Sequence, residues 1–228
     1  MGMERFFNIA GPCVAADHYM LPATERLPEV VGMIRRKQYF VIHAPRQSGK
    51  TTALKQLVRD INGSGERVAL YCSLETLQNV MDVASAMSTV ATVIWKAVRT
   101  APVFADIADG IRQYAMSDDV TRDAATGLLS LLSRLAADCG KPLVIFFDEA
   151  DCLSYDPLVA FLRQLRNGYV NREDVPFPAS VALVGLRNIK DYKMRIRPDG
   201  ESVGQASPFN VITEVLPMRL FSEAEMRS

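Results

Sequence analysis

The segment from Tyr39 to Ile61 restricts the fold of this chain more than any other. An apolar run over Tyr39–Ala44 predicts a buried strand, and apolar residues recur at helical spacing over Lys50–Ile61. A short loop that ends in Gly-Lys-Thr joins the two. Such a loop directs backbone amides and the positive end of the following helix at an anion. The segment therefore predicts a phosphate-binding loop on an α/β fold.

The loop resembles the Walker A motif, G-x-x-x-x-G-K-[ST], except that Ala44 stands at the first glycine position. In that motif Gly49 lets the backbone approach the anion, Lys50 reaches the β- and γ-phosphates, and the Thr51 hydroxyl holds Mg²⁺. Because alanine restricts φ where glycine is free, a tighter loop is expected. The residues predicted to contact the nucleotide are Ala44, Pro45, Arg46, Gln47, Ser48, Gly49, Lys50, Thr51 and Thr52.

A second informative segment lies about a hundred residues further on, at Pro142–Asp151. Its five consecutive apolar residues predict a strand buried on both faces, as in a parallel sheet. The strand ends in Asp148 and Glu149, and this pattern resembles the Walker B motif. Asp148 is then predicted to bind Mg²⁺, and Glu149 to polarise the attacking water as a general base.

The composition is that of an ordinary globular protein, with 228 residues and one domain expected. Lys plus Arg and Asp plus Glu both number 26, which argues against bulk attraction to nucleic acid or an anionic membrane. The four cysteines form no C-x-x-C pair, and no signal peptide or membrane span is evident. We therefore expect a cytoplasmic protein with reduced thiols.

Further elements are predicted from apolar periodicity and turn residues. Helices are expected over residues 28–37, 76–98, 104–116, 119–139 and 156–169, the last with Asp156 as N-cap and Pro157 at its first position. Strands are expected over residues 67–73, 179–186 and 211–216.

The pattern divides the chain into three segments: a lead-in with a short helix over 1–37, a core over 38–220, and a final segment over 221–228. The resemblance to P-loop ATPases implies that this final segment is the start of a missing helical lid. Ser222–Glu225 has the form of a capping box, which opens a helix. In many P-loop ATPases, which the loop resembles, the segment before the core covers the adenine. By that resemblance Tyr19, Met20 and Leu21 are candidates for this role, with a packed surface arm as the alternative.

The order of motifs and elements resembles the additional-strand P-loop ATPases. More narrowly, it is similar to bacterial AAA-like proteins near the archaeal-type ATPases and the STAND signalling NTPases. The resemblance implies a three-layer α/β fold with a five-stranded, mainly parallel sheet in the order 5-1-4-3-2, and helices on both faces. It also implies ATP and Mg²⁺ as ligands. After the fourth strand, Arg187 is the STAND-like candidate for a γ-phosphate sensor, and Asn188 is the competing candidate.

Three hypotheses about function stay open at this point. The first is a Mg²⁺-dependent ATP hydrolase, with Glu149, Lys50 and a sensor at Arg187 or Asn188 as catalytic residues. The second is a nucleotide-dependent switch or scaffold with little turnover, acting on a protein partner or within a homo-oligomer. The third is an ATPase that handles nucleic acid, suggested only by basic residues in the 190–208 loop.

Overall fold

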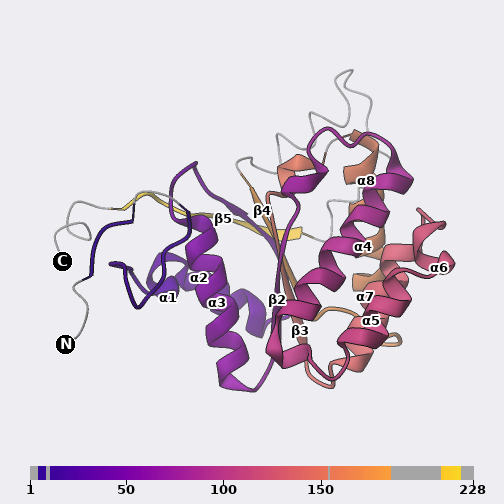
Figure 1. Cartoon of the computed structure of the whole chain (residues 1–228), viewed down its shortest axis with the longest axis horizontal. Coiled ribbons are helices and arrows are strands. Elements are labelled where there is room, and N and C mark those ends of the chain that lie inside the picture. The colour runs from indigo at the N-terminus through magenta and orange to yellow at the C-terminus, as the bar shows by residue number, and fades with distance from the viewer. Residues whose placement is uncertain (1–4, 9–10, 154, 186–211, 222–228) are drawn as a thin grey trace.

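The computed structural model describes residues 5–8, 11–153, 155–185 and 212–221. A twisted sheet forms the middle layer, and helices cover both of its faces (Figure 1). The five strands are β1 Tyr39–His43, β2 Val68–Ser73, β3 Leu143–Asp148, β4 Ser180–Gly185 and β5 Ile212–Pro217. The α-helices are α1 Ala23–Arg26, α2 Pro28–Arg35, α3 Lys50–Ser64, α4 Val83–Thr100, α5 Ala108–Ala115, α6 Asp118–Thr121, α7 Gly127–Asp138 and α8 Tyr155–Val170. Three short 3₁₀ turns are η1 Glu75–Leu77, η2 Pro102–Phe104 and η3 Ala150–Cys152.

The sheet order is β2-β3-β4-β1-β5, which is the predicted order 5-1-4-3-2 when the strands are counted from the opposite side of the sheet. Every pairing is parallel. The three-layer P-loop fold predicted from the sequence is therefore confirmed. Because all strands run the same way, the carboxyl ends of β1, β3 and β4 lie at one edge of the sheet, where such folds bind ligands.

Successive side chains along each strand point to opposite faces of the sheet, so the interior is divided into two hydrophobic cores. In β1, Tyr39 and Val41 pack into the core beneath α4, α7 and α8, whereas Phe40 and Ile42 pack against α1, α2 and α3. Figure 1 shows these two groups of helices on opposite sides of the sheet. Residues of β3 alternate in the same way and are all buried, as expected for the central part of a parallel sheet.

The helix predicted over 119–139 is wrong in its extent, because the chain turns in the middle of it. The Asp123 carboxylate accepts hydrogen bonds from the backbone amides of Ala125 and Thr126, which ends α6 and starts α7. A Cβ on Gly127 would lie 2.4 Å from the carbonyl oxygen of Val120. The glycine thus permits α6 to pack closely against the start of α7.

Three other helix starts also differ from the prediction. The helix expected from residue 104 begins at Ala108, after the 3₁₀ turn η2. The helix expected from residue 76 begins at Val83, because the Asp82 carboxylate caps the backbone amide of Ser85 at 2.7 Å. The last predicted helix begins at Tyr155, so Asp156 lies in its first turn and is not the N-cap.

Several predictions fall on residues outside the described ranges. These are the sensor candidates Arg187 and Asn188, the basic residues of the 190–208 loop, and the capping box in the 221–228 segment. Among the helices that the structure describes, none is long and apolar enough to span a membrane.

Candidate nucleotide-binding site

A pocket of about 1080 Å³ opens at the carboxyl edge of the sheet. One wall is the loop from Pro45 to Thr52, and the opposite wall comes from the ends of β2 and β3. Eight of the nine residues predicted to contact a nucleotide line this pocket. The ninth, Ala44, is fully buried beneath the loop, where its amide donates to the Gly185 carbonyl at 3.0 Å.

The loop tolerates the missing glycine for a conformational reason. Its left-handed residues are Gln47, with φ 59°, and Gly49, with φ 76°, and Ala44 is not among them. A Cβ at position 44 therefore introduces no backbone strain. Gly49 is the N-cap of α3, so the amides of the first helical turn are directed toward the pocket.

Lys50 lies between the two acidic residues at the end of β3. Its Nζ is 3.0 Å from Oδ1 of Asp148 and 2.6 Å from Oε1 of Glu149. Burial opposes the charged form of Lys50, but the charges and hydrogen bonds of both carboxylates outweigh it and raise the pKa. Lys50 is therefore a cation throughout the neutral range, placed where a phosphate chain would meet the acidic pair.

The Asp148 carboxylate is 1% exposed and is surrounded by donors. Oδ2 accepts from the Thr51 hydroxyl at 3.0 Å and from the Tyr71 hydroxyl at 2.9 Å, while Oδ1 accepts from the Glu149 amide at 2.9 Å. Thr51 and Asp148 thus present two hard oxygen ligands side by side. One carboxylate and one hydroxyl, completed by phosphate oxygens and water, is a donor set that suits Mg²⁺. The residues present therefore fit the ion that the motifs imply.

Glu149 has an unusual backbone conformation. Its φ of 55° and ψ of 40° lie in the left-handed region, which costs an L-residue about 1–2 kcal/mol. This turns the chain abruptly from β3 into η3 and keeps the side chain at the pocket, 33% exposed. Strain of this kind is commonly held at functional positions.

Arg26 connects the phosphate loop to the segment that follows β5. Its Nη2 donates to the Ser48 carbonyl at 2.7 Å and to the Arg219 carbonyl at 2.8 Å. Its guanidinium also lies 3.7 Å from the ring centre of Phe221, a cation–π contact. A Cβ on Gly49 would be 3.5 Å from that ring. The sequence offered no sign of this role, because the contacts join segments far apart in the chain.

Replacing Arg26 with alanine is expected to lower the free energy of unfolding by about 2–4 kcal/mol. The change leaves two carbonyls without their donor in a site where Arg26 itself is only 5% exposed. Urea unfolding followed by circular dichroism measures the loss. Arg35→Ala, at an exposed position on α2, is the matched control and is expected to change stability by less than about 0.5 kcal/mol. Equal stability of the two variants would contradict a structural role for Arg26.

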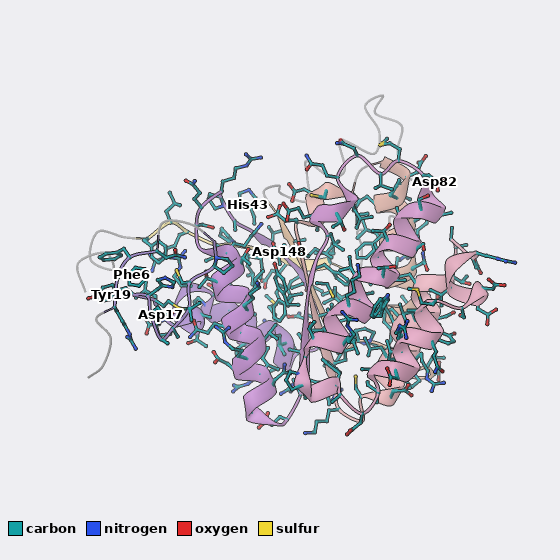
Figure 2. All side chains as sticks on the ribbon, in the orientation of Figure 1. Phe6, Asp17, Tyr19, His43, Asp82 and Asp148 are labelled. Atoms are coloured by element: carbon teal, nitrogen blue, oxygen red, sulfur yellow. The ribbon has the colours of Figure 1, made fainter. Side chains whose placement is uncertain are left out.

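The lead-in also reaches the pocket, although not through the residues predicted to do so. Gly11 and Pro12 line it, and the Cys13 amide donates to Oγ1 of Thr52 at 2.9 Å. Tyr19 stacks on Phe7 and, with Met20 and Leu21, is not part of the pocket lining. Figure 2 shows Tyr19 beside Phe6 at one end of the molecule, away from Asp148.

Comparison with solved structures supports the fold. The Walker-type ATPase of Pyrococcus abyssi superposes with a TM-score of 0.61 at 11% identity, covering 96% of this chain and 58% of the other. The ORC1 protein of Aeropyrum pernix, solved in complex with DNA, gives 0.53 at 17% identity, covering 91% and 48%. Drosophila ORC, bound to poly(dA/dT) DNA and Cdc6, gives 0.52 at 8% identity, covering 87% and 29%. This chain thus spans between 29% and 58% of the length of these proteins.

Sequence comparison supplies the family. No curated protein sequence matches the chain at a significant level. The sequence profile of the AAA domain matches residues 34–192, a range that contains the phosphate loop, Tyr71 and the acidic pair. This range covers more than half of the chain, so the protein belongs to the AAA domain family of P-loop ATPases.

Proposed function

We propose that this domain binds ATP together with Mg²⁺ and hydrolyses the bond to the γ-phosphate. The observation that carries the proposal is the position of Lys50, within 3.0 Å of both Asp148 and Glu149 at the N-terminus of α3. Positive charge, metal ligands and a base thus meet at one point in the pocket. Phosphoryl transfer requires these groups together, because its catalysis is mostly positioning and electrostatic stabilisation.

Each residue has a defined role in this proposal. The amides of the loop and Lys50 hold the β- and γ-phosphates and balance the charge that develops on them. Thr51 and Asp148 hold the Mg²⁺, which supplies further positive charge at the phosphate oxygens. Glu149 accepts a hydrogen bond from the attacking water and orients it toward phosphorus. Arg187 or Asn188, outside the described residues, is the proposed sensor of the γ-phosphate.

The nucleotide state is proposed to act on a protein partner or on a second copy of the chain. The Arg26 contacts support this, because they join the phosphate loop to the backbone that leaves the sheet. A cytoplasmic location is part of the proposal, since all four cysteines are unpaired thiols, as a reducing compartment would keep them.

A switch with little turnover is the second candidate. The contact of 2.6 Å between Lys50 and Glu149 favours it, because the carboxylate oxygen that Lys50 engages is not available to the attacking water. A nucleic-acid partner is the third candidate. Two of the solved structures named above contain DNA, but the basic residues that suggest this role here lie outside the described ranges.

Titration of the protein with ATP, with and without Mg²⁺, tests the proposal. We expect Mg²⁺ to tighten ATP binding at least about tenfold, and phosphate release only when the metal is present. Tight binding with no phosphate release would select the switch. Absence of ATP binding at millimolar concentration would refute nucleotide binding altogether.

A further inference from the structure

Tyr71 lies in the pocket but belongs to neither phosphate-binding motif. It is on β2, at the edge of the sheet, and its register partner on β3 is Phe146. Side chains two residues apart share a face, so Tyr71, Phe146 and Asp148 all face α3. A phenol is long enough to reach its diagonal neighbour, and the Tyr71 hydroxyl bonds to Asp148 in this way.

The hydroxyl binds the oxygen of Asp148 that also contacts Thr51. Tyr71 donates to Oδ2 at 2.9 Å, and Thr51 donates to the same atom at 3.0 Å. The other oxygen, Oδ1, is held by Lys50 at 3.0 Å. Without Tyr71, Thr51 would be the one remaining hydrogen-bond donor to Oδ2 among the described residues, and Thr51 is itself a proposed metal ligand. Tyr71 thus holds Oδ2 without being a proposed metal ligand itself.

The phenol is also held in place by its surroundings. Its ring is half-buried against α3, with Nζ of Lys55 5.3 Å from the ring centre. The side chain is therefore fixed by packing on one side and by Asp148 on the other.

We propose that Tyr71 is a positioning residue for the divalent metal: its hydroxyl fixes the Asp148 carboxylate beside Thr51 and thereby sets the affinity for Mg²⁺. The proposal rests on the Mg²⁺-dependent nucleotide binding proposed above. Residues that hold a metal ligand in place typically change metal affinity by about 10–100-fold when they are lost. Tyr71 does not touch the phosphates in this proposal, so ATP binding without metal is left unchanged.

The test compares Tyr71→Phe with the parent protein, using a non-hydrolysable ATP analogue. Tyr39→Phe is the matched control, because it also removes one tyrosine hydroxyl, here from a bond of 2.8 Å to the Pro178 carbonyl. Tyr39 lies at the start of β1, so it is at the amino ends of the parallel strands, whereas the pocket is at their carboxyl ends. Binding of the analogue is measured in EDTA and across a Mg²⁺ titration, and thermal unfolding of each variant is recorded.

For Tyr71→Phe we expect the Mg²⁺ concentration at half-saturation to rise about tenfold, with affinity in EDTA changed less than about twofold. Turnover is expected to recover at high Mg²⁺, as a loss of metal affinity requires. Tyr39→Phe should unfold earlier and keep the Mg²⁺ dependence of the parent. A Mg²⁺ titration of Tyr71→Phe that matches the parent would overturn the proposal.

A second variant separates the hydroxyl from the ring. Tyr71→Leu removes both, and we expect the same shift in Mg²⁺ dependence as for Tyr71→Phe. A shift seen only in the leucine variant would assign the effect to ring packing and overturn the role of the hydroxyl. If the parent protein itself did not respond to Mg²⁺, the proposed function would be contradicted. If the parent responded and Tyr71→Phe responded equally, the role of Tyr71 alone would be contradicted.

Discussion

Replacement of Lys50 by alanine is expected to weaken binding of Mg²⁺-ATP by about 100-fold or more, corresponding to roughly 3 kcal/mol. Lys50 is the cation of the pocket that lies at the start of α3, between the loop and the acidic pair. Its loss removes charge-assisted hydrogen bonds to two phosphates. It also leaves the negative charges of Asp148 and Glu149 facing the triphosphate without an intervening cation. Isothermal titration or fluorescence of a labelled nucleotide measures the change in affinity.

The same substitution also removes a partner from Asp148, which is 1% exposed. Asp148 keeps its bonds to Thr51, Tyr71 and the Glu149 amide, so the free energy of unfolding is expected to fall by only about 1–3 kcal/mol. Unfolding must therefore be measured in parallel, to show that the variant is folded where binding is tested. Lys141→Ala is the control, since Lys141 is exposed and precedes β3 at the opposite edge of the sheet. Full ATP affinity in folded Lys50→Ala would contradict the assignment of this loop.

The central part of the site could be predicted because its residues are local to two short segments. Gly49, Lys50 and Thr51 follow one buried strand directly, and Asp148 and Glu149 follow another. Parallel strands bring their carboxyl ends to the same edge, so two motifs that are about a hundred residues apart in sequence meet in space. The order of strands, in contrast, came from the resemblance to known ATPases, since apolar periodicity does not specify which strands are neighbours.

The residues that were missed depend on contacts between distant segments. Tyr71 bonds to a residue 77 positions away, and this requires the register of β2 against β3. Arg26 bonds to carbonyls 22 and 193 positions away, although its sequence context suggests only a short helix. The break at Asp123 was missed for the opposite reason. It is local, because the Asp123 carboxylate accepts hydrogen bonds from the backbone amides two and three residues further on, which competes with helix formation. These bonds leave no trace in the pattern of apolar residues, from which the helix was predicted.

The substitution Glu149→Gln is expected to lower the rate of ATP hydrolysis by about 10²–10⁴-fold, the usual contribution of a general base. Glutamine has the shape of glutamate but cannot accept the proton of the attacking water. The left-handed backbone conformation at φ 55° costs glutamine the same free energy as glutamate, so the strain at this position is unchanged. Removing the carboxylate frees Lys50 from its contact of 2.6 Å. Affinity for Mg²⁺-ATP is therefore expected to be equal to that of the parent or slightly higher.

Phosphate release under single-turnover conditions, together with nucleotide binding, separates this variant from Lys50→Ala, which loses both properties. Asp60→Asn makes the same chemical change at an exposed position on α3 and is expected to retain full turnover. If Glu149→Gln hydrolysed ATP at the parental rate, another group would have to orient the water. If the parent were as slow as Glu149→Gln, the carboxylate held by Lys50 would not act as a base, and the chain would work as a nucleotide-dependent switch.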